Sequence, residues 1–307
     1  MINGLLLHSV SYSGSWGQPL LTLEAFIDHA ADLGFDGVML MAKRPHLSVL
    51  DYNTDGRRRL REKIEKRGLR KVCLAGYTNL TADLAHSDIP QHELQVAHIL
   101  ELARAAHDLG CALVRIFTGY EDNTVSFQRQ WDLVIAALRE GADRAAEFEV
   151  TLGVQNHHDI AVDVASLGDL IVEIARPNCR AMFDAWAPAL QGEDIAEAAR
   201  QIAPLSVHTT VANYKKRPRY RYNPALVSYE KQPSRAQAVA MDQGFIDYAA
   251  FFRALEEAGF DGTVAYEMCS PLLGGATLGN LDRHAAAFLE FMYAKCGVAH
   301  RLTSALE

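Results

Sequence analysis

Short apolar runs alternate along this chain with longer stretches whose apolar residues fall on one helical face. Short runs of this kind are typical of buried strands and the longer stretches of amphipathic helices, so the pattern predicts repeated strand and helix units. We expect eight strands, at residues 5–7, 37–41, 71–75, 113–117, 151–155, 180–184, 205–208 and 263–267. We expect eight helices, at residues 22–33, 55–67, 90–109, 127–148, 164–174, 194–202, 248–258 and 281–295.

Repeated turn sequences support this count. The sequence Gly-Phe-Asp-Gly at 34–37 recurs at 259–262, and each copy places a Gly where a helix would end and a strand would begin shortly afterwards. We therefore predict an α/β fold, a (β/α)8 TIM barrel, with residues 1–307 forming a single domain. A doubly wound open sheet is the alternative, but no G-x-G-x-x-G follows the first strand and no P-loop pattern is present.

Composition narrows the class of protein. The chain has 307 residues, of which 49% are hydrophobic, and this length suits one barrel domain. The net charge of −8 disfavours nucleic acid as a partner, because the protein would repel a phosphate backbone. Five scattered cysteines without a C-x-x-C pair indicate reduced thiols. Neither a signal peptide nor a membrane span is expected, so we predict a cytoplasmic protein.

Four polar residues stand at or near the ends of apolar runs, namely Gln155, Asp184, His208 and Glu267. If the barrel closes, the ends of strands five to eight are neighbours on one rim, and these side chains can converge on one ion. Oxygen donors with one imidazole suit a divalent metal, with Mn²⁺ first and Mg²⁺, Co²⁺ or Zn²⁺ as alternatives. We therefore predict one divalent metal ion as the cofactor.

Each of these residues also has a structural alternative. Glu267 could form a buried ion pair with Arg115 or another cation, Asp184 could cap the following segment, and His208 could be a hydrogen-bonded core histidine. Gln155 can coordinate a cation through its carbonyl oxygen, although more weakly than a carboxylate, and it cannot accept a proton from carbon.

A polar stretch, Asn-His-His-Asp at 156–159, directly follows Gln155. An imidazole at this point could act as a general base near neutral pH, because an unperturbed His titrates at about 6.5. We choose His158 as the base over His157, which is left as a substrate contact. Glu267 is the second residue predicted to carry a proton.

Three sequences carry a family resemblance: Gln-Asn-His-His-Asp at 155–159, Phe-Asp-Ala-Trp-Ala-Pro at 183–188 and Gly-Phe-Asp-Gly-Thr-Val-Ala-Tyr-Glu at 259–267. With the order of elements, they resemble the xylose isomerase-like TIM barrel superfamily, in particular its sugar phosphate isomerase/epimerase branch. In ketose 3-epimerases of that group, a Glu, Asp, His and Glu set binds Mn²⁺ or a similar ion, and the two Glu residues exchange protons with opposite faces of a sugar carbon. By position, Asp184, His208 and Glu267 match this set, and Gln155 replaces the first Glu.

That replacement disfavours a simple two-Glu epimerase, because inversion at carbon by that route needs a base on each face. The resemblance still implies a metal-dependent carbohydrate enzyme that moves a proton next to a sugar carbonyl through an enediolate, an isomerase or epimerase. The alternative is a lyase that cleaves 3-oxo-glycosides by elimination, similar to the catalytic subunits of C-glycoside deglycosidases. A non-enzymatic alternative is a sugar-binding or partner-subunit barrel with a decayed site.

The endonuclease IV branch of the superfamily holds three zinc ions and uses additional His and Asp ligands. The position three residues after Asp184 is Ala187 rather than His, and no His-x-Asp or Asp-x-His pair follows His208. These differences favour a single metal ion and a small-molecule carbohydrate substrate over DNA.

A long segment at about 213–244 carries seven Lys and Arg residues, among them Lys215 and Arg217, with four interleaved tyrosines. We expect a basic and aromatic loop that acts as a lid or binds an anionic sugar, or else a solvated flap or a subunit contact. The partner in such a contact would be another copy in a homo-oligomer or a second subunit. The residues predicted to contact substrate are His8, Trp16, His46, Tyr77, Tyr120, His157, Trp186, Lys215 and Arg217.

Overall fold

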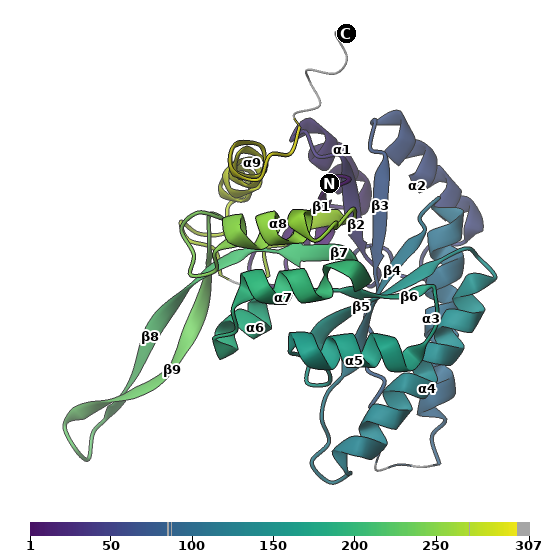
Figure 1. The fold of residues 1–307 in the computed structure, drawn as a ribbon. Coiled ribbons are helices and arrows are strands. Elements are labelled where there is room, and N and C mark those ends of the chain that lie inside the picture. Colours follow the sequence, from purple (N-terminus) through teal and green to yellow (C-terminus); the bar gives the residue numbers. More distant parts are fainter. Residues whose placement is uncertain (85, 87, 270, 300–307) are drawn as a thin grey trace.

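Eight parallel strands form a closed barrel at the centre of the computed structural model, which describes residues 1–84, 86, 88–269 and 271–299 (Figure 1). Around the ring, β1 is followed by β10, β7, β6, β5, β4, β3 and β2. The strands are β1 (Leu5–His8), β2 (Gly37–Met41), β3 (Lys71–Ala75), β4 (Leu113–Gly119), β5 (Thr151–His158), β6 (Cys179–Met182), β7 (Ser206–Val211) and β10 (Thr263–Tyr266).

Helices surround the barrel and alternate with its strands, so the predicted (β/α)8 TIM barrel is confirmed (Figure 1). Several of them begin at a Ser, Thr, Asn or Asp whose side chain accepts a free backbone N–H of the first turn, as Asn53 and Asp163 do. The helices are α1 (Leu23–Asp32), α2 (Thr54–Lys66), α3 (Gln91–Asp108), α4 (Phe127–Ala146), α5 (Val164–Ile174), α6 (Trp186–Gln191), α7 (Ile195–Ile202), α8 (Tyr248–Glu257) and α9 (Leu278–Lys295).

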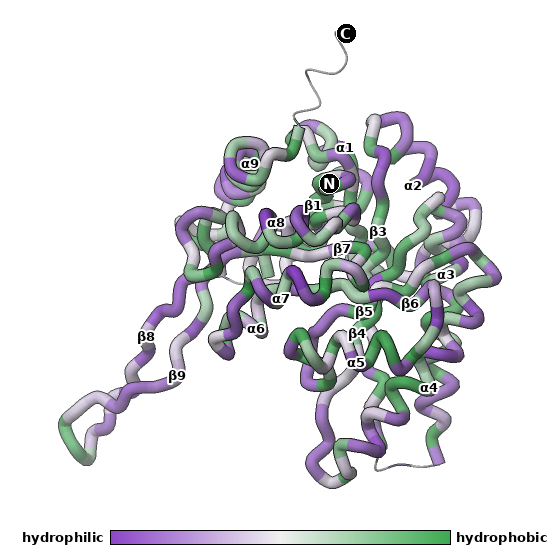
Figure 2. The backbone as a smooth tube through the Cα atoms, viewed as in Figure 1, coloured by the Kyte–Doolittle hydropathy of each residue, from purple (hydrophilic) through white to green (hydrophobic). Residues whose placement is uncertain are grey.

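The hydrophobic core has two parts. The larger part lies between the strands and the helices, and the smaller part fills the inside of the barrel with Leu6, Met39, Ala75, Met182 and Ala265 among others. Figure 2 shows the hydrophobic strands at the centre and hydrophilic residues along the outer helices. Both faces of a barrel strand are therefore covered, which explains why these strands appear in the sequence as nearly continuous apolar runs.

The repeated turn sequence has the predicted conformation. Gly34 follows α1 with a φ of +90°, and Gly259 follows α8 with a φ of +82°. A side chain at either position would be strained in this left-handed region, so Gly allows the helix to end and the next strand to begin.

Strand register brings the predicted site residues to one end of the barrel. Gln155 on β5 pairs with Phe117 on β4 and with Met182 on β6. Asp184 follows the end of β6 by two residues, and Glu267 directly follows β10. These strands end slightly earlier than predicted, and both carboxylates consequently stand in the loops at the C-terminal rim, where TIM barrels place their active sites.

The segment at 213–244 corrects one prediction, because most of it is not an irregular loop. It forms an antiparallel hairpin of β8 (Asn213–Asn223) and β9 (Ser228–Val239), which projects away from the barrel (Figure 1). Most of its side chains are exposed on both faces. Strands are recognised in a sequence by one apolar and one polar face, and this hairpin has no such alternation over most of its length.

Two smaller features were not predicted. The short helix α6 begins two residues after Asp184, and α9 begins three residues earlier than expected. That residues 1–307 form one domain stays a prediction, since residues 300–307 lie outside the described residues. None of the helices in the described part of the chain combines the length and apolar character needed to cross a membrane.

Candidate active site

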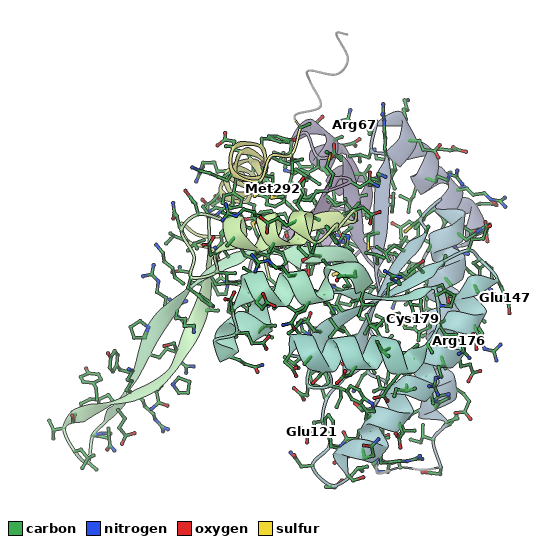
Figure 3. The ribbon with its side chains drawn as sticks, viewed as in Figure 1. Arg67, Glu121, Glu147, Arg176, Cys179 and Met292 are labelled. Carbon is green, nitrogen blue, oxygen red and sulfur yellow. The ribbon has the colours of Figure 1, made fainter. Side chains whose placement is uncertain are left out.

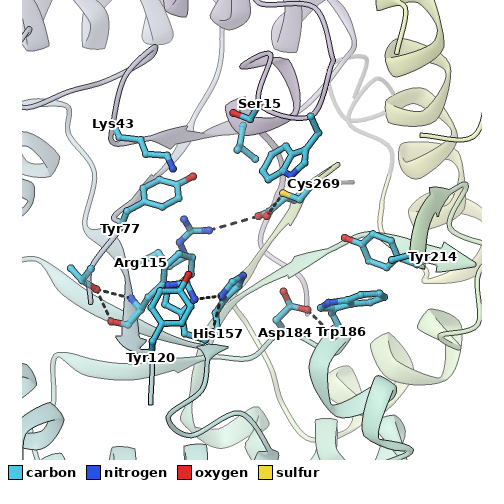
Figure 4. Close-up of a pocket in the computed structure, with 17 residues that line it drawn as sticks. Ser15, Lys43, Tyr77, Arg115, Tyr120, His157, Asp184, Trp186, Tyr214 and Cys269 are labelled. Carbon is cyan, nitrogen blue, oxygen red and sulfur yellow. Dashed lines mark hydrogen bonds and ion pairs between the residues drawn. The ribbon is translucent and has the colours of Figure 1, made fainter. Parts of the chain in front are cut away.

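A cavity of about 610 Å³ opens among the loops at the C-terminal ends of the barrel strands (Figure 4). Its volume lies within the range of pockets that bind small molecules. Eight of the residues predicted from the sequence line it: Trp16, Tyr77, Tyr120, His157, His158, Asp184, Trp186 and Glu267.

Glu267 faces a buried cation in this cavity. Its Oε2 lies 3.7 Å from Nη1 of Arg115 and 3.5 Å from Nε2 of His8, while its Oε1 accepts a hydrogen bond from Sγ of Cys269 at 2.5 Å. Arg115 extends from β4 and is 1% exposed, and its guanidinium lies 4.1 Å from the ring centre of Phe117 and 4.8 Å from that of Tyr77. The predicted alternative for Glu267, an ion pair with Arg115, is therefore present.

Asp184 is held in a hydrogen-bond network with Gln155. Nε2 of Gln155 donates to Oδ2 of Asp184 at 2.9 Å and to Oγ1 of Thr210 at 2.9 Å. The other carboxylate oxygen accepts the backbone N–H of Trp186, so the predicted capping role of Asp184 is also present. Desolvation, together with the negative charge of Glu267, raises the pKa of Asp184 to about 6.

His208 lies deeper in the barrel than the two carboxylates and does not line the cavity. It pairs in register with Thr263 on β10, four residues before Glu267, and its Nδ1 is 2.6 Å from Oγ1 of Thr263. Burial, with a contribution from the charge of Arg115, lowers the pKa of His208 to about 3. The imidazole is consequently neutral at pH 7, the form that a metal ligand requires.

Unsatisfied polar atoms cluster around this site. Seven buried side-chain N and O atoms lack a hydrogen bond among the described residues, and five of them belong to His8, Arg115, Gln155, His208 and Glu267. Because buried polar groups are nearly always paired in native proteins, such a concentration indicates a site that binds a polar or charged species.

The donor atoms fit a divalent cation. Oε1 of Gln155, Nε2 of His208 and Oε2 of Glu267 are all buried without a hydrogen bond, and amide, imidazole and carboxylate donors suit such an ion. Within the described residues, no group of three or more His, Cys, Asp and Glu side chains forms a metal-holding cluster, so the amide oxygen of Gln155 would have to contribute. A metal would also share Glu267 with Arg115.

The two consecutive histidines are arranged as a pair beside the cavity. Nδ1 of His157 accepts the backbone N–H of His158 at 2.8 Å and lies 2.9 Å from Nδ1 of His158. Since the first contact requires an unprotonated Nδ1 on His157, the second requires His158 to donate its Nδ1–H. This arrangement leaves Nε2 of His158 as a free basic atom. The His158 ring also stacks on Tyr120, with the ring centres 4.0 Å apart.

Four predicted substrate contacts do not line the cavity. His8 is fully buried behind Glu267, and Lys215 and Arg217 lie on the hairpin, where they line a separate shallow pocket. His46 is 2% exposed and has a structural environment, because its Nδ1 lies 3.0 Å from Oγ of Ser9 and its Nε2 lies 3.1 Å from the carbonyl oxygen of Leu21.

Nine residues that line the cavity are outside the predicted site, and three of them carry a charge or a thiol. Arg115 was considered only as an alternative partner of Glu267, although an Arg inside the apolar run Leu-Val-Arg-Ile-Phe is itself an unusual signal. Lys43 lines the cavity with Nζ 4.0 Å from the ring centre of Tyr77, and desolvation followed by the charge of Arg115 lowers its pKa. Cys269 also lines it and carries no distinctive sequence signal.

The environment of His46 predicts a dependence of stability on pH. Burial lowers the pKa of His46 in the folded protein, whereas in the unfolded chain it titrates at about 6.5. As the pH falls, the unfolded state therefore takes up the proton first. The contribution of the neutral His46 side chain to the free energy of unfolding is complete above about pH 6.5. Below that pH, the free energy of unfolding decreases by at most about 1.4 kcal/mol per pH unit for one proton. Urea unfolding of the wild type and of His46→Gln between about pH 7.5 and 5 should show a smaller decrease for the variant. Equal decreases would contradict this role.

Several solved structures of known proteins have the same fold. A D-psicose 3-epimerase from Clostridium cellulolyticum H10 is 16% identical with a TM-score of 0.73, over 95% of this chain and 99% of that chain. A probable 3-DHS dehydratase from Bacillus anthracis is 15% identical with a TM-score of 0.71, over 95% and 99% of the two chains. A 3-keto-D-glucoside 4-epimerase from E. coli is 13% identical with a TM-score of 0.70, over 95% and 99%.

These likenesses show the fold. The sequence matches none of the curated proteins. The sequence profile of one family, described as xylose isomerase-like TIM barrel, matches residues 27–293. Because this match spans most of its length, the chain belongs to the xylose isomerase-like TIM barrel family.

Proposed function

We propose that this protein is an enzyme that moves a proton on a carbon next to the carbonyl of a small carbohydrate, by way of an enediolate. The observation that carries the proposal is the meeting of a free imidazole, two carboxylates and a buried guanidinium in one cavity, from His158, Asp184, Glu267 and Arg115. A carbon acid of this kind needs a base for its proton and positive charge near the oxygen that becomes an oxyanion.

His158 is the proposed base. Its Nδ1–H is directed to His157, so Nε2 is the atom that can accept a proton from substrate. Desolvation and the nearby charge of Arg115 lower the pKa of His158, and Asp159 raises it in part. The net lowering keeps the ring unprotonated at neutral pH, as a general base requires.

Arg115 and Lys43 supply the positive charge in the proposed mechanism. Both line the cavity, and Arg115 is held by Glu267 on one side and by Phe117 on the other. A cation fixed in a site with little water stabilises a developing oxyanion without having to reorganise during the reaction. Trp16 and Trp186 add aromatic surface against which the apolar face of a sugar can pack.

The proposed metal site consists of Gln155, His208, Glu267 and Asp184, with Mn²⁺ as the first candidate. When bound, such an ion would polarise the substrate carbonyl and lower the energy of the enediolate. Nε2 of Gln155 orients Asp184 by donating a hydrogen bond to it, so Oε1 of Gln155 is left as the atom that would coordinate the metal. Thr263 orients His208 through Nδ1 and leaves its Nε2 free in the same way.

A lyase acting on 3-oxo-glycosides is the second candidate. Gln155 supplies no base, so the geometry favours reactions that need one mobile base over an inversion that uses a carboxylate on each face. Elimination is such a reaction, and a cavity of about 610 Å³ has room for a sugar with an attached aglycone. The hydrophobic contact between Trp186 and Tyr214, with ring centres 4.0 Å apart, offers surface for an aromatic aglycone.

The direct test is exchange of hydrogen with solvent. Purified protein with added Mn²⁺ is incubated in D₂O with a panel of keto sugars and 3-oxo-glycosides, and the products are followed by NMR. Deuterium at the carbon next to the carbonyl supports the proposal, with an isomeric sugar indicating an isomerase or epimerase and a released aglycone indicating the lyase. Binding of sugars with no exchange in any substrate would instead support a non-catalytic sugar-binding barrel.

Replacement of His158 tests the proposed base. We expect His158→Gln to lower the exchange rate by about 10²- to 10⁴-fold, the usual contribution of a general base. In the wild type the rate should fall only below about pH 6.5, because the pKa of His158 is lowered from its ordinary value. The matched control is His92→Gln on α3, where the imidazole lies 3.2 Å from Glu140. Exchange by His158→Gln at the rate of the control would exclude His158 as the base.

A further inference from the structure

The hairpin of β8 and β9 has the form of an arm. Its strands have 11 and 12 residues, and Figure 1 shows them extending together beyond the helices of the barrel. No side chain between residues 218 and 235 is buried, and Figure 3 shows side chains projecting from the hairpin on both sides. The outer half of the hairpin is therefore in contact with solvent on all of its faces.

Among the described residues, the hairpin contacts the barrel at its base. Nδ2 of Asn213 donates to the carbonyl oxygens of Met241 and Ile246, and Tyr214 packs against Trp186. Towards the tip, the interactions are within the hairpin, such as the contact of Tyr222 with Tyr229 at 5.3 Å. A two-stranded hairpin without further packing is only marginally stable in water, so a long free one indicates that something else covers it.

The hairpin and the rest of the chain have opposite net charges. Residues 213–239 contain seven Lys and Arg residues and a single Glu, which gives a formal charge of +6. The whole chain carries −8, so the residues outside the hairpin carry −14. One molecule thus presents a strongly basic projection and an acidic body, and these surfaces attract each other between copies.

We propose that the hairpin is an interaction arm that binds the acidic surface of a second copy of this chain. Its tip supplies apolar area for such a contact, since Leu226 is 66% exposed, Val227 is 80% exposed and Tyr220 is 61% exposed. Aromatic and Arg side chains are the residues most enriched in protein interfaces, and both are concentrated here. The same −14 charge on the body opposes nucleic acid as the occupant, because a phosphate backbone that reached the hairpin would also meet the acidic barrel.

The contact is made by side chains and not by added strands. Both edges of a two-stranded sheet are open, but Pro218 in β8 and Pro233 in β9 lack the N–H that a further strand would need. An association carried by charged side chains weakens as salt screens them, and this gives the proposal a measurable property.

Sedimentation velocity of the full chain tests the proposal, with about 0.05 M and about 0.5 M salt as the two conditions. The wild type is expected to sediment at low salt with a mass of at least twice 33.9 kDa, and to shift towards the protomer at high salt. Reversal of three exposed charges on the hairpin, in Arg219→Glu, Arg221→Glu and Lys231→Glu together, should weaken association by about tenfold or more.

The matched control reverses the same number of charges on α2, in Arg58→Glu, Arg59→Glu and Lys66→Glu, which are also exposed. Association that survives in this control and is lost in the hairpin variant supports the arm. The proposal is overturned by a protomer mass at both salt concentrations, by equal behaviour of the two variants, or by tight hairpin-dependent binding of a labelled oligonucleotide at about 0.15 M salt.

Discussion

Glu267→Gln is expected to lower the rate of hydrogen exchange by about a thousandfold, because it removes a charge that acts directly at the reacting centre. Glu267 is a carboxylate close to both Arg115 and His8, and its Oε2 is one of the buried atoms without a hydrogen bond. Gln has nearly the same shape, so the substitution removes the charge while it keeps the packing. Exchange measured by NMR in D₂O gives the size of the effect.

The metal content of Glu267→Gln gives a second readout. If Glu267 is a ligand, the purified variant should retain less Mn²⁺ than the wild type when both are dialysed and measured by elemental analysis. Cys269→Ser is the matched control, because it changes the group that donates to Oε1 of Glu267 without changing the charge. Wild-type exchange together with wild-type metal content in Glu267→Gln would remove this residue from the mechanism.

Arg115→Met is expected to lower exchange by about 10²- to 10³-fold, comparable with the loss of one oxyanion donor. Met has an apolar side chain of similar length that can still pack between Phe117 and Tyr77, so the substitution mainly removes the positive charge. The free energy of unfolding should fall by only about 1–2 kcal/mol, since the partner Glu267 is partly exposed and can be solvated. Urea unfolding separates this cost from the effect on exchange.

The dependence of the exchange rate on pH in Arg115→Met distinguishes an electrostatic role of Arg115 from a purely structural one. The charge of Arg115 lowers the pKa of His158, so its removal should raise that pKa and move the acidic limb of the exchange profile to higher pH. Affinity for Mn²⁺ should increase, because a positive charge 3.7 Å from Oε2 of Glu267 is lost. An acidic limb at the same pH as in the wild type would contradict the proposed coupling.

Much of the barrel could be predicted because its physical signals are local. Buried parallel strands are apolar on both faces, and Gly34 and Gly259 stand where a helix must end in a left-handed residue. Closure of the barrel brings together residues that are far apart in the sequence, which is why Asp184 and Glu267 are expected in one site. Both line the cavity. Gln155 and His208 proved to lie deeper, because strand register, and not sequence, sets their depth.

The remaining features depend on tertiary contacts. Arg115 sits in the middle of an apolar strand. The sequence indicates it only as an alternative ion-pair partner of Glu267, and its place in the cavity wall follows from the closed barrel. His46 was predicted to contact substrate, yet Ser9 and Leu21 bind both nitrogens in the interior. The hairpin escaped recognition because neither of its faces is buried over its outer half, so its strands lack the alternation that reveals strands elsewhere.

The two ends of the hairpin meet at the barrel, where Asn213 pairs with Val239. Such an insertion can be shortened to a tight turn above the pair of Arg217 and Arg235 without changing the distance that the chain must bridge. Tyr214 and Ala236, which belong to the cavity wall, would stay in place. The protein is therefore modular, and a trimmed chain offers a way to study the chemistry of the pocket separately from assembly.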